Sequence, residues 1–495
     1  MQTVQEVEKH VPVREGDYGE RVATVEPGGV EYISLKERHG KPIDLFWTWL
    51  SPNLEFATVY VGVLGVAVFG LSFWQTALAI VVGSALGSLT HFVLSSWGPK
   101  FGVPMMVESR GAFGFLGNIL PAGLNAFTGT IGWFIVNSVS GAFALQALAL
   151  LINLSLPFWL TFLVIVVAQV VIATFGHNFI HAFERWALPL LGVVFALATI
   201  FIFTKANLGL GVNTKAPVFV GEFGSFTLLF TATFGYAAGW NPYAADYTRY
   251  QPPTVNRNLV GLWAALGVFV SCVVIELAGA ALATVAGTKW GPTDIPTVQL
   301  QVAMPNIIYY LTLLCISIGA VAANAINIYS GTMSLVAVGI REMGLTLRQR
   351  RALLAVAAGV LGYIIGIVGQ ANVGPGSKYE FFLLLISYWI APWLAVVLVD
   401  YWQRKGDYGD ESLFYDTKHQ RWQGAAAMAI GLVVSVGLFS DNGVIYNGPI
   451  PNAIPQIGDL TFIVGFVLTA VLYYAFNMMS RPASSRAGMA GTRAA

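Results

Sequence analysis

Long apolar stretches separated by short polar segments run along most of the chain. A membrane-spanning helix needs about 20 mostly apolar residues, and twelve stretches meet this requirement. Ten-residue segments of alternating polarity are absent, and helices satisfy their own backbone polar groups in lipid. The pattern therefore predicts an all-α membrane protein with spans near residues 46–70, 73–97, 119–151, 157–176, 184–204, 224–245, 258–286, 306–340, 352–370, 379–402, 424–440 and 459–479.

The first and sixth stretches are interrupted at corresponding places. Pro52 interrupts the first, and polar Asn53 and Glu55 follow it; Gly239 and Pro242 interrupt the sixth. Proline cannot donate a backbone hydrogen bond, so carbonyl groups are freed. One such kink is common in membrane helices. Two at matched positions of two five-helix halves are typical of a transporter site built on an inverted repeat, where freed carbonyls hold a cation or a polar substrate group.

The third stretch carries a polar helix face. Trp133, Asn137 and Ser140 follow i, i+4, i+7 spacing, which places them on one side of a helix. Tryptophan offers a flat stacking surface, and asparagine offers both a donor and an acceptor. This pair suits a planar heterocycle with amide-like edges. The alternative is a tryptophan packed between helices and an asparagine bonded to a neighbour.

The eighth stretch carries a stripe of small and polar residues. On a helix, five of its residues fall on one face: Ser317, Ala320, Asn324, Asn327 and Gly331. Such a stripe suits close helix packing or a binding site. The two asparagines make packing alone the weaker explanation.

The ionisable residues that lie more than three residues from either end of a predicted span are Glu55, His91 and Glu276. Charged groups are costly in lipid, so each is a candidate for function. Each also has a structural alternative. Glu55 can cap the amides freed beside Pro52, His91 can reach the membrane interface, and Glu276 can be protonated or paired.

The positive charges are distributed unevenly between the two sides. With twelve spans, 22 of the 26 Lys and Arg residues lie on the side that carries both termini. Cytoplasmic segments of membrane proteins are enriched in Lys and Arg. We therefore expect a protein of the cell membrane with a single transporter domain (45–480) between flexible cytoplasmic tails (1–44 and 481–495).

Composition and motifs narrow the class of protein. The chain is 56% hydrophobic and 10% charged, with a net charge of +1, so a nucleic-acid partner is not expected. Its two cysteines lie in apolar runs and suggest neither a disulfide framework nor a metal cluster. Phosphate-loop, G-x-S-x-G and H-E-x-x-H motifs are absent. We expect no enzyme and no cofactor, apart from Na⁺ as a coupling ion.

Four segments carry a resemblance to a known family. They are ERHGKPIDLFWTWLSPNL, GPKFGVPMMVESRGAFGFLGNILPAGLN, GWFIVNS and GWNPYAADYTRYQPP. Over about residues 31–480 the chain resembles the nucleobase-cation-symport-1 family, in particular its purine–cytosine permease-like branch. The resemblance implies a leucine-transporter-type fold, with spans 1–5 and 6–10 as inverted repeats and spans 11–12 at the periphery. It also implies symport of a nucleobase or related ring with Na⁺ or H⁺.

The resemblance further implies a substrate site. Trp133 matches the family's stacking tryptophan, and Asn137 matches a polar partner that is often Gln in the family, so the substrate of this chain stays open. The remaining substrate-binding positions are an aromatic at Tyr236 or Trp240 and, approximately, the asparagine pair Asn324 and Asn327.

A cation site is implied between the first and eighth spans. Its positions here are Leu50, Asn53, Ala320 and Ala323. The eighth span has no hydroxyls where the family carries a pair of them. This weakens the case for Na⁺ and leaves H⁺ open, with Glu55 as the candidate carrier.

Together these observations predict a secondary active symporter that imports a purine, cytosine or related heterocycle by alternating access. Trp133 and an aromatic of the sixth span would sandwich the ring, and Asn53, Asn137 and Asn324 would contact its edges. The alternatives are a vitamin-like, hydantoin or allantoin-type substrate, a non-transporting membrane sensor of the same fold, and an intramembrane enzyme. The expected partners are the substrate, a cation and the lipid bilayer; the oligomeric state is left open.

Overall fold

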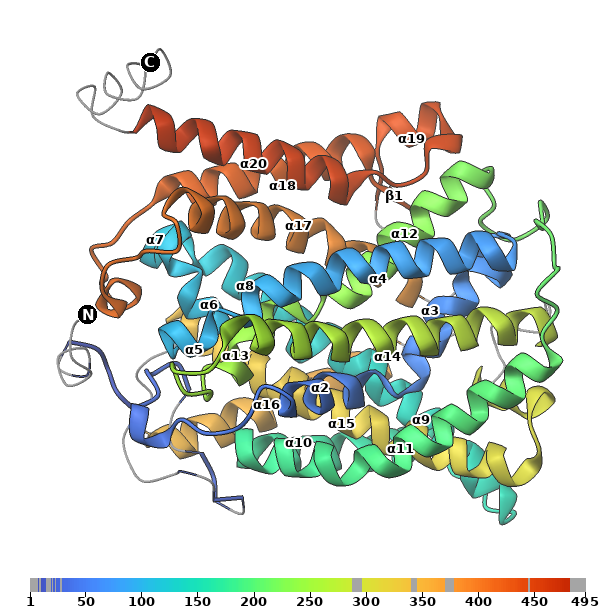
Figure 1. Ribbon diagram of the computed structural model, residues 1–495. Coiled ribbons are helices and arrows are strands. Elements are labelled where there is room, and N and C mark those ends of the chain that lie inside the picture. Colours follow the sequence, from blue (N-terminus) through green and yellow to red (C-terminus); the bar gives the residue numbers. More distant parts are fainter. Residues whose placement is uncertain are drawn as a thin grey trace.

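The protein is a bundle of long helices (Figure 1). The computed structural model describes residues 8, 10–14, 19, 21–22, 24–26, 29–286, 296–339, 345–369, 378–443 and 446–480. Within these residues, nine continuous helices are long and apolar enough to cross a membrane. They are α4 (Phe73–Ser95), α8 (Ile119–Phe127) continued by η4 (Thr128–Trp133) and α9 (Phe134–Leu151), α10 (Phe158–Phe175), α11 (His177–Lys205), α14 (Arg257–Ala286), α15 (Asn306–Val338), α17 (Tyr379–Gln403), α18 (Trp422–Phe439) and α20 (Thr461–Met479).

The three other predicted spans are bent or short helices. The first consists of α2 (Asp44–Leu50), η2 (Ser51–Asn53), α3 (Phe56–Val63) and η3 (Leu64–Val68), whose two parts meet at 66°. The sixth consists of α12 (Glu222–Ala238), η5 (Asn241–Tyr243) and α13 (Ala244–Thr248), and the ninth is α16 (Leu347–Val368). Each of the twelve predicted stretches therefore coincides with helix, and the all-α fold class is confirmed.

Shorter elements connect the long helices. They are η1 (Leu35–Glu37), α5 (Gly98–Phe101), α6 (Met105–Glu108), α7 (Arg110–Gly117), η6 (Pro296–Ala303), η7 (Glu411–Phe414), the antiparallel pair β1 (Asp441–Asn442) and β2 (Tyr446–Asn447), α19 (Pro449–Ala453) and η8 (Pro455–Ile457).

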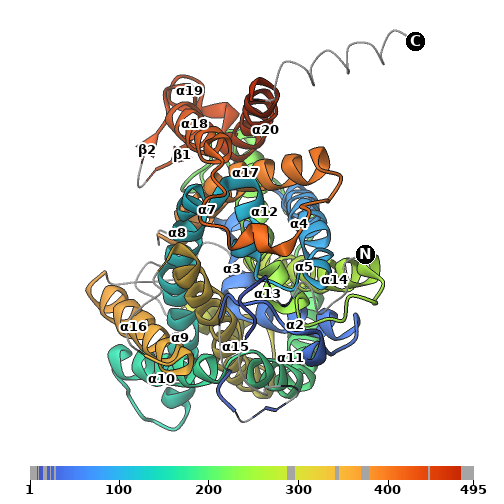
Figure 2. The same cartoon turned by 90° about the vertical axis from the view of Figure 1, so that its left-hand side faces the viewer.

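The two broken spans lie inside the bundle, and the last two spans lie outside it. The helix α14 packs on α2, α3 and α4, whereas α15 packs on α9, α10 and α11. The helices α18 and α20 pack on each other and on α17, at one edge of the molecule in both ribbon views (Figures 1 and 2). This agrees with the expected peripheral position of spans 11 and 12.

Glycines allow one broken span to approach its neighbour closely. A Cβ atom added at Gly62 of α3 would lie 1.7 Å from the carbonyl oxygen of Glu276 on α14. A Cβ atom at Gly279 of α14 would lie 1.7 Å from the carbonyl oxygen of Val59. Small residues of this kind let membrane helices pack backbone to backbone, so this pair holds α3 against α14.

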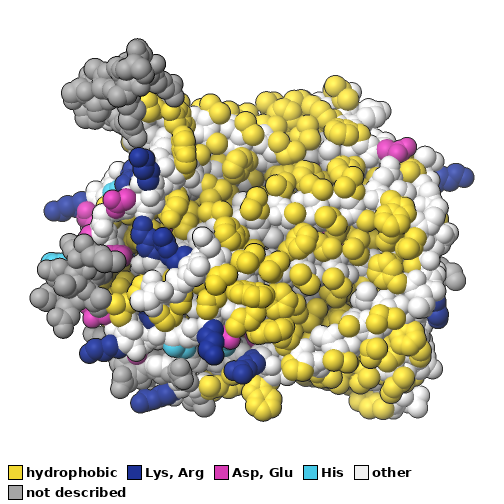
Figure 3. All heavy atoms as spheres, in the orientation of Figure 1, with side chains coloured by type: hydrophobic (Ala, Val, Ile, Leu, Met, Phe, Trp, Pro, Cys, Tyr) yellow, Lys and Arg dark blue, Asp and Glu magenta, His cyan; other side chains and the backbone are white. Residues whose placement is uncertain are grey.

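The outer surface is apolar over the middle of the bundle and charged toward one end. Large apolar side chains such as Trp74, Val193 and Val433 are 66%, 61% and 70% exposed. In Figure 3, hydrophobic side chains cover the middle of the visible face, and Lys and Arg gather at its left-hand end. A broad apolar surface with a charged margin fits a lipid environment.

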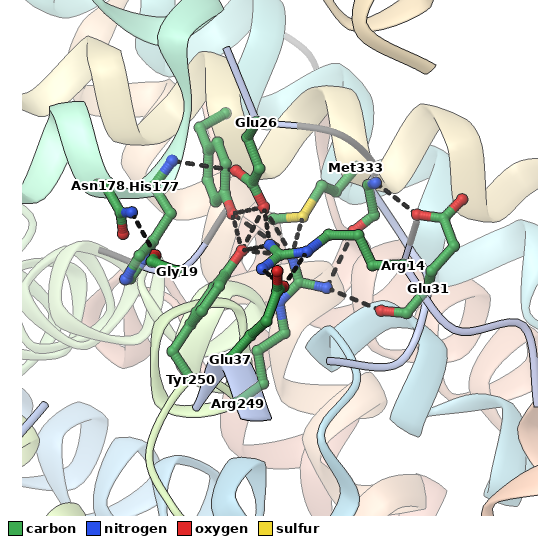
Figure 4. Close-up of polar contacts among 12 residues, drawn as sticks. Arg14, Gly19, Glu26, Glu31, Glu37, His177, Asn178, Arg249, Tyr250 and Met333 are labelled. Atoms are coloured by element: carbon green, nitrogen blue, oxygen red, sulfur yellow. Dashed lines mark hydrogen bonds and ion pairs between the residues drawn. The ribbon is translucent and has the colours of Figure 1, made fainter. Parts of the chain in front are cut away.

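The described part of the N-terminal segment packs against one end of the bundle, which we call the N-terminal face, and Arg14 and Glu26 are buried there. Arg14 Nη1 donates to Glu26 Oε1 at 3.1 Å and to the Tyr250 hydroxyl at 3.1 Å, and Arg14 Nε donates to Glu37 Oε2 at 3.0 Å (Figure 4). Arg14 and Glu26 are 4% and 0% exposed. The expectation of a flexible tail is wrong for these residues, because buried charges require fixed partners. The tail 481–495 lies outside the described residues.

Arg14, Glu26, Glu37 and Tyr250 form what we call the Arg14 cluster, and this cluster contacts three spans. Glu26 Oε2 accepts from the backbone N–H of His177, the first residue of α11. Glu26 also pairs with Arg249, 3.7 Å away, and accepts from the Tyr329 hydroxyl of α15 at 3.4 Å. Burial alone would lower the pKa of the Arg14 guanidinium, but Tyr250, Glu26 and Glu37 outweigh it and hold this pKa above its usual value. Arg14 is therefore charged and binds the N-terminal segment to the bundle.

Candidate functional site

The two broken spans meet through one asparagine. Asn53 Oδ1 accepts from Trp240 Nε1 at 2.9 Å, which joins the break in the first span to the break in the sixth. Asn53 Nδ2 donates to the carbonyl of Trp49 at 3.0 Å and to Ser271 Oγ of α14 at 2.9 Å. Asn53 is fully buried. Both atoms of its side-chain amide therefore form hydrogen bonds that hold the two breaks together. Its contact with a substrate stays a prediction.

Glu55 caps the second half of the first span. Its backbone is extended, and its carboxylate accepts from the N–H groups of Ala57 at 2.8 Å and Thr58 at 3.1 Å. The Tyr236 hydroxyl of α12 adds a third donor at 3.3 Å. A carboxylate is a favourable N-cap because it satisfies free backbone donors and complements the helix dipole. The structure therefore shows the capping role for Glu55, and the role of proton carrier stays a prediction.

Four of the predicted substrate-binding residues line one small cavity between the breaks. Trp133 and Tyr236 lie edge to face, with ring centroids 5.4 Å apart and planes at 85°. The cavity measures about 10 Å³, roughly the space for one water molecule. A heterocycle therefore requires these rings to move apart. The cavity is lined by Pro52, Trp133, Asn137, Tyr236, Gly239 and Trp240.

Trp133 owes its position to a π-helical turn. The segment η4 ends at Trp133, and α9 continues from it toward Asn137. Such turns widen the helix locally and are frequent at functional sites. Trp133 also packs edge to face against Phe382 of α17, at 5.1 Å. Ser140, expected on the same face, instead bonds to the carbonyl of Val136 and does not line the cavity.

Asn137 connects the cavity to an asparagine network. Its Nδ2 donates to Asn324 Oδ1 at 3.1 Å, and Asn327 Nδ2 donates to the same oxygen at 3.1 Å. Asn324 Nδ2 donates to the carbonyl of Phe134 at 2.8 Å and to Ser138 Oγ at 3.0 Å. Of these three asparagines, Asn137 lines the cavity, and its Nδ2 joins the cavity wall to the network.

The predicted stripe of the eighth span faces the third span. A Cβ atom at Gly141 of α9 would lie 2.8 Å from the Cβ of Ala320, and one at Gly331 would lie 2.5 Å from the Thr130 side chain. Ser317 Oγ donates to the carbonyl of Gly141 at 3.3 Å. The stripe is thus a packing surface, and its asparagines extend it toward the cavity.

The predicted cation positions have different neighbours. Ala320 faces α9, and its carbonyl accepts from Gln169 of α10 at 3.2 Å. Leu50 lines a separate, largely apolar groove of about 630 Å³ along α11 and α14. At the break itself, α15 approaches closely at Gly319, where an added Cβ would lie 2.2 Å from the carbonyl oxygen of Leu54. Ala323 is buried on α15. Among the described residues, no cluster of three His, Cys, Asp or Glu side chains could hold a metal ion.

The other two ionisable residues are buried and bonded. His91 Nδ1 and Asn241 Oδ1 of η5 lie 3.2 Å apart, so His91 does not reach the membrane interface and instead contacts the break of the sixth span. Glu276 Oε2 accepts from Ser84 Oγ of α4 at 3.5 Å.

Glu184 is a buried acid near the breaks that the sequence pattern did not single out. The fifth span was expected to begin at residue 184, whereas α11 begins at His177. Glu184 therefore lies inside the helix and is 1% exposed. The i, i+4, i+7 spacing of His177, His181 and Glu184 was the available signal for one polar helix face.

Comparison with known proteins identifies the family. Residues 32–465 match the sequence model of permeases for cytosine/purines, uracil, thiamine and allantoin. The putative purine-cytosine permease YxlA of Bacillus subtilis is 27% identical over 470 residues, which cover 94% of this chain and 98% of that protein. The purine-cytosine permease fcyB of Emericella nidulans is 28% identical over 91% of this chain and 87% of that protein.

A solved structure shares the fold. Mhp1, a nucleobase-cation-symport-1 family transporter in a closed conformation with bromovinylhydantoin bound, superposes with a TM-score of 0.67 at 18% identity. The match covers 90% of this chain and 93% of that chain. The leucine-transporter-type fold is thus confirmed. Since the family model spans most of the chain and the bundle with two broken spans agrees with it, this chain belongs to the family of permeases for cytosine, purines, uracil, thiamine and allantoin.

Proposed function

We propose that this permease is a secondary active symporter that imports a nucleobase-like heterocycle, a purine, cytosine or related ring, with Na⁺ or H⁺ by alternating access. The observation that carries the proposal is the cavity between the broken spans. The indole of Trp133 and the side-chain amide of Asn137 line it together with Tyr236 and Trp240. A flat stacking surface beside a hydrogen-bond acceptor suits a ring with N–H groups at its edge.

The roles within the site follow from the contacts. Trp240 is held by Asn53 and Tyr236 by Glu55, so either aromatic is fixed to a broken span that moves in alternating access. Trp133 and one of these rings would sandwich the substrate, with Asn137 at its edge and Asn324 and Asn327 orienting Asn137. The names of YxlA and fcyB support a purine or cytosine. The hydantoin bound to Mhp1 and the thiamine and allantoin of the family description support the runner-up, another small ring.

Uptake experiments test the function. The chain is expressed in cells that lack their own nucleobase permeases, and uptake of labelled adenine, hypoxanthine, cytosine, uracil, allantoin and thiamine is measured with and without Na⁺ and with a protonophore. We expect concentrative uptake of at least one ring that collapses with one ion gradient. Saturable binding without uptake would indicate a sensor, and chemical conversion of the ring would indicate an enzyme.

We also propose that the N-terminal face is cytoplasmic and that the protein lies in the cell membrane. The supporting observation is the gathering of Lys and Arg toward that end (Figure 3). Lys418 and Lys215 are exposed residues of the connections after α17 and α11. A cysteine at position 215 is expected to react with an impermeant maleimide in intact cells, and one at 418 only after permeabilisation. The native Cys272 and Cys315 are buried. The reverse labelling pattern would contradict this topology.

A further inference from the structure

Three buried polar side chains without hydrogen-bond partners come from three elements next to the breaks. In the described part of the chain, the Ser51 hydroxyl, both carboxyl oxygens of Glu184 and the Tyr247 hydroxyl make no hydrogen bond. These residues belong to η2, α11 and α13 and are 0%, 1% and 2% exposed. Buried polar groups are normally paired, so this set is an exception that requires a physical reason.

Ser51 and Tyr247 both interact with Glu184. The Ser51 hydroxyl lies close enough to the Glu184 carboxyl to interact with it, although the two do not form a well-aligned hydrogen bond. Tyr247 lies within electrostatic range of Glu184. An isolated carboxylate in an apolar interior is very costly, whereas a neutral carboxylic acid is not. In this conformation, the surroundings of Glu184 therefore favour its neutral, protonated carboxylic acid over the carboxylate.

A polar route leads from this set to the N-terminal face. A cavity of about 680 Å³ opens there between the N-terminal segment and α11, and Thr48, His181 and Tyr247 are among its lining residues. Thr48 Oγ1 and His181 Nδ1 lie 3.0 Å apart. On each helix the next polar residue follows three positions later, Ser51 after Thr48 and Glu184 after His181, and such residues share a helix face. The pair Thr48–His181 thus lies at the cavity, and the pair Ser51–Glu184 lies one helical turn further on, at the break.

We propose that Glu184, with Ser51 and Tyr247, is the binding site of the coupling proton, and that it exchanges this proton with the cavity at the N-terminal face through Thr48 and His181. The proposal rests on the proposed symport function and assigns its coupling ion. One proton leaves the Glu184 O–H bond for water of the cavity, a carboxylate remains, and one proton is taken up in the next cycle; no other bond changes. Glu55, by contrast, already accepts three hydrogen bonds within the protein.

The charged and titratable side chains around His181 and Glu184 all line the cavity at the N-terminal face. Those that influence His181 or Glu184 electrostatically are His39, Asp44, His177, Arg185 and Tyr247. Asp44 is the acid among them, and Arg185 is the guanidinium. Because Ser51 adjoins the joint between the two broken spans, a change in the charge of Glu184 acts where alternating access bends the first span.

The test separates coupling from substrate movement. Purified wild type and Glu184→Gln are reconstituted in proteoliposomes, with Glu276→Gln as a control because Glu276 is equally buried. Three quantities are measured: accumulation driven by a pH gradient, substrate-evoked proton entry reported by a pH-sensitive dye, and counterflow at equal pH. We expect Glu184→Gln to lose accumulation and proton entry but to keep counterflow, since glutamine imitates the protonated acid. Glu276→Gln is expected to keep all three.

Several outcomes would overturn the proposal. Proton-driven accumulation that survives in Glu184→Gln but is lost in Glu55→Gln or Glu276→Gln would assign the proton to another acid. Wild-type uptake that needs Na⁺ and evokes no proton entry would refute this inference and leave symport intact. Absence of counterflow for every ring in the wild type would refute the proposed function itself. If Glu184→Gln proves unstable by its melting temperature, Ser51→Ala and Tyr247→Phe serve instead, and proton entry per substrate that is unchanged in both would contradict the site.

Discussion

Trp133 touches three other aromatic rings, so its substitution affects packing as well as any bound ring. The centroids of Phe382, Tyr236 and Tyr379 lie 5.1, 5.4 and 6.5 Å from its own. Edge-to-face pairs are worth about 0.5–1.5 kcal/mol each beyond their buried area. At the scale of one residue, stability and affinity must therefore be measured together.

We expect Trp133→Ala to weaken substrate binding by about one to two orders of magnitude, because stacking of a base on an aromatic ring is worth roughly 1–3 kcal/mol. Trp133→Phe keeps a flat face and should lose less. Phe382→Ala is the control, since it removes one edge-to-face neighbour and leaves the indole in place. Affinity and melting temperature are measured on purified protein. A Trp133→Ala variant with lowered stability and unchanged affinity would remove Trp133 from the site.

At the scale of elements, the second half of the first span packs backbone to backbone on α14. The helices α3 and α14 approach at Gly62 and Gly279, where either added Cβ would overlap a carbonyl oxygen of the partner helix. Backbone atoms cannot turn aside as a flexible side chain can. A methyl group here must push the two helices apart.

We expect Gly62→Ala to destabilise the protein by about 1–3 kcal/mol or more, the cost of overpacking a well-filled interior. Gly123→Ala of α8 is the matched control, because nothing lies within 4 Å of its added Cβ. Melting temperatures in detergent compare the two variants. Equal melting temperatures would mean that α3 and α14 are not packed as closely as described.

At the scale of the whole molecule, the N-terminal segment closes one end of the bundle. Arg14 and Glu26 connect this segment with α11, α15 and Arg249, the residue that follows α13. Loss of one partner from a buried ion pair leaves an uncompensated charge and costs about 3–5 kcal/mol. The segment should therefore dissociate as a unit when the cluster is broken.

We expect Arg14→Ala to expose the residues beneath the segment. Met333 is 3% exposed and accepts from Arg249, so a cysteine placed there reports on opening. Its maleimide labelling in purified protein should be several-fold faster in the Arg14→Ala background. Lys36→Ala, an exposed position of the same segment, should leave the rate unchanged. Equal rates in both backgrounds would show that the Arg14 cluster does not close this face.

The sequence by itself determined the helical class of the apolar stretches and their places along the chain, because burial in lipid demands long apolar helices wherever the chain crosses. It also located the breaks, since Pro52, Gly239 and Pro242 act on their own backbone. Helical spacing placed Trp133 and Asn137 on one helix face, and both line the same cavity. These effects are local and can be recognised within a few turns of chain.

Only the tertiary structure decided which polar side-chain atoms form hydrogen bonds within the protein. Asn53 accepts a hydrogen bond from Trp240, a residue 187 positions away. The carboxylate of Glu55 accepts hydrogen bonds from the first residues of α3 and from Tyr236. Ser51 and Tyr247 are far from Glu184 in the chain, and both come near it only because α11 packs beside the breaks. The burial and pairing of a polar group depend on neighbours from distant elements, and no local pattern records those neighbours.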